Sequence, residues 1–169
     1  MPSSRNGPPA PSNQPISSNA IPSPAEVVLI VTGSTIAAES RDRPLAYRLR
    51  ERILAWIDQR DTQDNAEGES PPCARLHPTV CSDLWYLNDR ELAERPAIAI
   101  GEPHANAATS LISSRLPTAF VIEGSLRVHM DPEFIDLRAA LWGVNAASTA
   151  AAIDLFAERY LDEFLLAAQ

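Results

Sequence analysis

The sequence predicts one α/β domain, built as a three-layer sandwich in which helices cover both faces of a mostly parallel β-sheet. Short apolar runs of strand type alternate along the chain with segments of helical periodicity. Of only six glycines, Gly33, Gly101 and Gly143 each stand directly after an apolar run and before a helical segment. Such repeated strand-to-helix turns are typical of parallel strands joined by crossover helices.

The ends of the domain follow from composition. Residues 1–24 are rich in Pro, Ser, Asn and Gly and contain almost nothing apolar, so we expect a disordered tail. Residues 25–169 are predicted to form the single domain. Within it, residues 61–72 (DTQDNAEGESPP) resemble the tail in composition and are expected to form a mobile surface loop.

The first half of the domain contains two strands and a helix. The run 26–32 (EVVLIVT) is apolar and largely β-branched, which predicts a central parallel strand. Apolar residues then recur at helical spacing from Leu45 to Ile57 and predict an amphipathic helix. The run 76–81 is interrupted by Pro78, which lacks a backbone donor, so this strand is expected near a sheet edge.

The second half continues the alternation and adds a hairpin. Two β-rich runs separated by Glu123-Gly124-Ser125 predict a hairpin whose second strand is antiparallel to the sheet. The last helix carries its apolar residues on one stripe, from Ile153 to Leu165. In chain order, we expect a short helix at 89–94, a strand at 97–100, a helix at 105–115, the hairpin at 118–122 and 126–130, a strand at 137–142 and the last helix.

Charge and cysteine content exclude several classes of partner. The 22 Asp and Glu residues outnumber the 14 Lys and Arg residues, and the formal net charge of -8 argues against nucleic-acid binding. No apolar run approaches about 20 residues and no segment is basic and amphipathic, so we expect no membrane partner. With no secretory signal and only two cysteines, the protein is expected in the cytoplasm.

A ligand site is expected where the glycine turns meet. In open α/β sheets, ligands bind beyond the carboxyl ends of the strands, where helix N-termini present free N–H groups. We therefore predict a site for a small polar or anionic molecule there, with Asn106, Ser34 and Thr149 as the main contacts. The predicted ligand-binding residues are Gly33, Ser34, Thr35, Gly101, His104, Asn106, Asn145 and Thr149.

A second interpretation is that these polar side chains serve only the backbone. Asn145 or Ser148 can cap the last helix, and Ser34 or Thr35 can stabilise a turn. Neither G-x-G-x-x-G nor G-x-x-x-x-G-K-[ST] occurs, so the sequence identifies no cofactor.

Catalysis is a third hypothesis. His104 is expected near a helix N-terminus, which favours the neutral imidazole that can act as a base. Cys81 or Ser82 could then be the nucleophile of a small hydrolase or transferase. The alternatives are a surface histidine and a buried, inert thiol.

The remaining histidines and cysteines do not indicate a metal site. Cys73, His77 and Cys81 follow the spacing C-x₃-H-x₃-C, which lacks the close cysteine pair of structural zinc sites. We therefore predict no metal. His129 alternates with apolar neighbours in the hairpin and is expected on the solvent face.

An assembly role without a ligand is the main alternative function. The aromatic segment 84–87 (LWYL) has no clear period and is expected in the core, although Trp and Tyr are also frequent at interface centres. A homodimer would form through this segment or through the edge of the hairpin. Trp142 is expected in the core.

Residues 97–164 also resemble a known type of domain. The segments GEPHANAATSL and WGVNAASTAAAIDLF, each following a strand, are similar to small Rossmann-like bacterial domains of uncharacterised function. Related-looking sequences often have a second glycine where this chain has Glu102. The resemblance implies a Rossmann-like fold and assigns no activity or catalytic residue.

Overall fold

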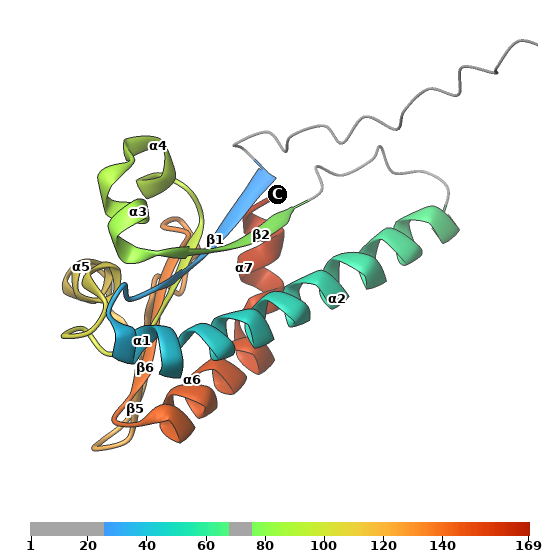
Figure 1. Cartoon of the computed structure of the whole chain (residues 1–169). Coiled ribbons are helices and arrows are strands. Elements are labelled where there is room, and N and C mark those ends of the chain that lie inside the picture. Colours follow the sequence, from blue (N-terminus) through green and yellow to red (C-terminus); the bar gives the residue numbers. More distant parts are fainter. Residues whose placement is uncertain (1–25, 68–75) are drawn as a thin grey trace, which may run out of the picture.

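The computed structural model describes residues 26–67 and 76–169, which form a six-stranded sheet in the order β2-β1-β3-β6-β5-β4 (Figure 1). Strands β2, β1, β3 and β6 are parallel, whereas β5 is antiparallel to both β6 and β4. The predicted mostly parallel sheet with an antiparallel hairpin is therefore confirmed. The strands are β1 (Val27–Thr32), β2 (His77–Ser82), β3 (Ala97–Ile100), β4 (Thr118–Ile122), β5 (Leu126–Met130) and β6 (Arg138–Gly143).

Seven helices lie within the described residues. Long helices follow β1 and β6, and shorter ones follow β2 and β3. No helix among them is both long enough and apolar enough to cross a bilayer. The helices are α1 (Ile36–Arg41), α2 (Arg43–Glu67), α3 (Asp83–Asn88), α4 (Arg90–Ala93), α5 (Ala107–Arg115), α6 (Ala146–Arg159) and α7 (Leu161–Ala167).

The central strands bury side chains on both of their faces. In β1, Val28 and Ile30 belong to one buried cluster, and Leu29 and Val31 belong to a second one. Because successive strand residues point to opposite faces, the two clusters lie on opposite sides of the sheet. Helices α2, α6 and α7 contribute to the first cluster, and α3 and α5 contribute to the second. This double burial explains the continuous apolar run of β1.

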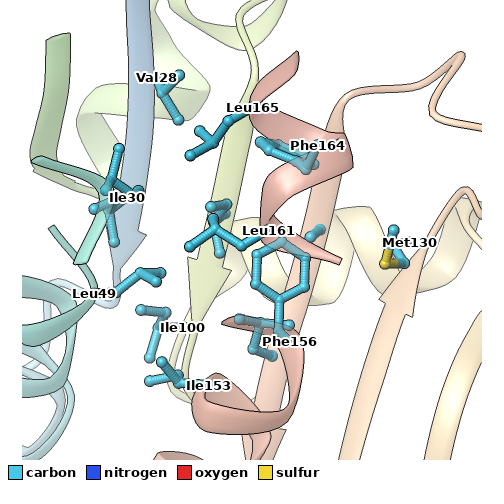
Figure 2. Close-up of a cluster of buried hydrophobic side chains, with 14 of the residues drawn as sticks. Val28, Ile30, Leu49, Ile100, Met130, Ile153, Phe156, Leu161, Phe164 and Leu165 are labelled. Atoms are coloured by element: carbon cyan, nitrogen blue, oxygen red, sulfur yellow. The ribbon is translucent and has the colours of Figure 1, made fainter. Parts of the chain in front are cut away.

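The apolar stripe of the last helical segment forms much of the first cluster. Phe156, Phe164 and Leu165 point toward the strands of the sheet in Figure 2. The segment is not one continuous helix, because its backbone leaves helical geometry at Tyr160 and α7 begins at the next residue. No glycine or proline marks this break, so the sequence did not predict it.

Helix α2 is longer than its apolar pattern predicted. It continues through residues 61–67, which were expected to lie in the loop 61–72. These seven residues contain neither glycine nor proline, so nothing in the backbone stops the helix. The polar residues 61–63 are exposed to water. Residues 68–72 and the tail 1–24 lie outside the described residues.

Two further expectations about burial were wrong. The segment 84–87 forms most of the unpredicted helix α3. Within this segment only Tyr86 is buried, while Leu84 and Trp85 are more than half exposed. A single helical turn cannot bury consecutive residues on one face, which is why the core interpretation holds for Tyr86 alone. His129 is buried rather than exposed, because its ring stacks on Trp142, which itself is only partly buried.

The connections between the parallel strands change direction once along the sheet, at β1. After β1 the chain returns to the sheet as β2 on one side of β1, and then crosses to β3 on the other side. The edge position of β2 agrees with its proline. The carboxyl ends of β1 and β3 therefore flank the point at which the connections diverge, where open α/β sheets bind their ligands.

Candidate functional site

A shallow hollow lies at this switch point. Its volume is about 560 Å³, and its walls come from the turns after β1, β2 and β3 and from one side of α5. Hydroxyl, carboxylate and imidazole groups alternate with apolar ones around it. The lining residues are Thr35, Asp83, Pro103, His104, Ala105, Ala107, Ser110, Leu111 and Ser114.

Asn106, an expected ligand contact, is instead fully buried, and its side chain forms all of its hydrogen bonds with backbone groups. Its Nδ2 donates to the carbonyl of Val31 at 3.0 Å and to that of Ile100 at 2.8 Å. Its Oδ1 accepts from the backbone amides of Ala108 and Thr109, which caps α5. The side chain thus ties the ends of β1 and β3 to the start of α5 and has no hydrogen-bonding group left for a ligand.

The glycines of the first two turns are required by close approach. A Cβ on Gly33 would collide with the carbonyl oxygen of Ala105, because the turn after β3 lies directly against the turn after β1. Gly101 has a positive φ of 108° and faces the buried carboxylate of Asp42. The space between the two turns is therefore filled by protein, and the hollow lies beside it.

Most of the other predicted ligand residues bond the backbone of the chain, and the rest are exposed. Asn145 forms a capping box with Ser148 at α6, as the second interpretation expected. Thr35, which that interpretation assigned to a turn, caps α1 by accepting from the amide of Ala38. Thr149 is buried, and its hydroxyl bonds the amide and carbonyl of Gly143. Ser34 is exposed. Of the eight predicted residues, Thr35 and His104 line the hollow. No residue of the turn after β6 lines it.

Asp83 lines the hollow, although it is not among the eight predicted ligand-binding residues. Its side chain is almost completely buried, and its two oxygens accept from the backbone amides of Leu84 and Ala107, each at 2.8 Å. Ala107 is the first residue of α5, so a carboxylate of the chain itself occupies this helix N-terminus. The signal was the pair Ser82-Asp83 directly after a strand, since Ser82 caps α3 through the amide of Trp85.

The charges near the hollow are mainly negative. Glu102 lies 3.1 Å from Nδ1 of His104, whose side chain is largely exposed. Arg41 pairs with the buried Asp42 at 2.8 Å, and this carboxylate and Glu102 raise the pKa of the Arg41 guanidinium. Among the residues that line the hollow, Asp83 is the acidic one.

The residues proposed for catalysis serve other roles. Burial raises the pKa of the Cys81 thiol to about 11, so it is protonated at neutral pH and is a poor nucleophile. The ring of His104 lies beside the Glu102 carboxylate, while the Ser82 hydroxyl caps α3. Within residues 26–67 and 76–169, no group of three His, Cys, Asp or Glu side chains could hold a metal ion, and Cys73 lies outside these ranges.

Comparison of the chain with protein-family models, with curated proteins and with solved structures found no match.

Proposed function

We propose that this protein is a binding module that holds a small hydrogen-bond-donating molecule, an amine or a polyol, in the hollow at the switch point. The observation that carries the proposal is the position of the hollow. It is bounded by the turns after three neighbouring parallel strands, β2, β1 and β3, on the side of the sheet where such folds bind ligands.

The groups around the hollow favour a donor over an anion. Asp83 already occupies the N-terminus of α5, so an incoming anion would meet a carboxylate where helix dipoles usually attract negative charge. Each Asp83 oxygen accepts one described hydrogen bond and keeps further lone-pair capacity. The hydroxyls of Ser110 and Ser114 add acceptors along α5. This chemistry narrows the expected polar or anionic ligand to an amine or a polyol.

The proposal includes a Rossmann-like, three-layer architecture. Buried clusters on opposite sides of β1 support it, as does the order β2-β1-β3, with which one of the two common doubly wound strand orders begins.

Thermal unfolding in the presence of simple probes tests the proposed ligand class. We expect spermidine or ribitol to raise the Tm of the wild-type protein by several degrees at about 100 times Kd, and phosphate and citrate to leave it unchanged. Native mass spectrometry of freshly purified protein would identify a retained ligand. Stabilisation by the anions alone, or by none of the probes, would refute the proposed ligand class.

A pair of substitutions on α5 tests the location. Ser110→Leu places a bulky side chain on an exposed position that lines the hollow, so we expect it to abolish the Tm shift. Ser113→Leu, on the same helix but outside the lining, is the control and should retain the shift. Equal shifts in both variants would place the site elsewhere.

A further inference from the structure

The strand β4 forms one edge of the sheet and is unusually apolar for that position. Its sequence, TAFVI, contains no charged residue. Val121 is 41% exposed and Ile122 is 48% exposed. Edge strands present unpaired backbone N–H and C=O groups, and proteins normally protect them with charges, prolines or bulges. An exposed apolar edge therefore indicates a surface that another strand can cover.

Only the first half of β4 carries such protection. Pro117 precedes the strand, and the register with β5 shifts between Thr118 and Phe120, as at a β-bulge. Beyond Phe120 the strand is regular. The carbonyl of Ile122 accepts from the amide of Ser125 and so points toward β5. Because these directions alternate in an antiparallel pair, the N–H and C=O of Val121 point to the open side.

The opposite edge of the sheet is protected. Strand β2 contains Pro78, which has no N–H to donate. The carbonyl of Pro78 accepts a hydrogen bond from Nε of Arg50 on α2 at 3.2 Å. Of the two edges of this sheet, β4 is therefore the one suited to pairing.

We propose that two copies of this chain associate by antiparallel pairing of their β4 strands around a two-fold axis, which joins the two sheets into one. A single open edge per copy closes a dimer, whereas two open edges would allow a filament. Charges of opposite sign flank the strand: Arg115 ends α5 three residues before it, and Glu123, which also lies 3.9 Å from Arg127 of its own chain, follows it directly. In an antiparallel pair the Arg115 end of one copy faces the Glu123 end of the other.

This inference goes beyond the proposed ligand binding and is independent of it. The hollow lies at the turns after β1, β2 and β3 and along one side of α5, whereas the proposed pairing uses the edge strand β4, which is separated from β3 by β6 and β5.

Sedimentation velocity over roughly 5 to 200 µM protein tests the dimer. We expect a species of twice the 18.4 kDa chain mass to accumulate with concentration. Val121→Lys should keep the protein monomeric, because it places a charge on the paired edge. Leu166→Lys, on α7, is the matched control, since Leu166 has the same 41% exposure, and this variant should dimerise like the wild type. A wild-type monomer throughout the series, or a Val121→Lys dimer, would overturn the proposal.

Hydrogen exchange provides a test that needs no variant. We expect the amides of 118–122 to exchange more slowly as the wild-type concentration rises, while those of 77–82 on the other edge do not change. Protection of 118–122 that appears only after addition of another protein would assign the edge to a different partner and would refute self-association.

Discussion

At the scale of single residues, polar side chains at the ends of the strands mainly hold the protein together. Asn106 joins two strand ends and a helix start, and Thr149 joins the end of β6 to α6. Both are buried and fully bonded, so their removal would leave backbone groups without partners. Thr35 and His104, in contrast, lie where a ligand could reach them.

Substitution of Asn106 is expected to destabilise the protein strongly. Asn106→Ala leaves two buried carbonyls and two helix amides without their side-chain partner, which costs about 3 kcal/mol or more of the free energy of unfolding. Asn145→Ala removes an exposed cap and should cost about 1 kcal/mol. Urea denaturation measures both values. Similar losses in the two variants would contradict the clamp role of Asn106.

His129 is expected to make stability depend on pH. Burial lowers the pKa of its ring below the ordinary histidine value of 6.5, although a hydrogen bond to the carbonyl of Leu116 opposes this shift. The unfolded chain therefore binds the proton more readily, so the free energy of unfolding should fall as the pH drops below 6.5. His129→Phe should weaken this dependence, and His104→Ala, at an exposed site, should retain it. Urea titrations at several pH values provide the measurement, and unchanged slopes in His129→Phe would refute the assignment.

At the scale of elements, the turns after β1 and β3 are built around each other. The turn after β1 needs a residue without Cβ because the carbonyl of Ala105 lies against it. On the other side of the sheet, Arg48 and Arg52 of α2 both contact Asp154 of α6, at 2.7 and 2.6 Å. These pairs are half-exposed and join two helices that the shared apolar cluster already holds together.

A methyl group at Gly33 is expected to force the two turns apart. Gly33→Ala should lower the free energy of unfolding by at least about 2 kcal/mol, because the colliding atom belongs to the backbone and cannot rotate away. Gly124→Ala is the comparison. Its Cβ would point into open space, and only the positive φ of 68° opposes it, at about 1 kcal/mol. Chemical denaturation of both variants measures the two losses in the free energy of unfolding. A larger loss for Gly124→Ala than for Gly33→Ala would contradict the close approach of Gly33 to Ala105.

At the scale of the whole molecule, stability is expected to decrease from the centre of the sheet toward its edges. Strands β1, β3 and β6 have neighbours on both sides, and most of their side chains are buried. Strand β4 has one neighbour and is half exposed. The sheet therefore combines a rigid centre next to the hollow with a less stable edge available for pairing.

Hydrogen exchange at low micromolar concentration measures this gradient. We expect the amides of β1 and β3 to exchange only through global unfolding, and those of β4 to exchange through local opening. Equal protection of β3 and β4 in the monomer would contradict the gradient.

The sequence by itself determined the strands, the hairpin and the positions of the glycine turns. Continuous apolar runs, Pro78 at an edge and the Glu123-Gly124-Ser125 loop are local signals, and local patterns are sufficient to specify such elements. The capping roles of Thr35 and Asn145 are also local, because a cap bonds amides within three residues of itself. Helix α2 extends beyond the residues with an apolar periodicity, because polar residues can continue a helix in water.

Only the tertiary structure decided what occupies the space between the turns. Asn106 bonds Val31, Asp83 bonds Ala107 and His129 stacks on Trp142, and each contact joins residues that are far apart in the chain. Whether a polar side chain is available to a ligand depends on such contacts, since a buried polar group must be hydrogen-bonded. The sequence therefore predicted which turns follow the strands, whereas the packing of the chain determined which of their side chains remain open to a ligand.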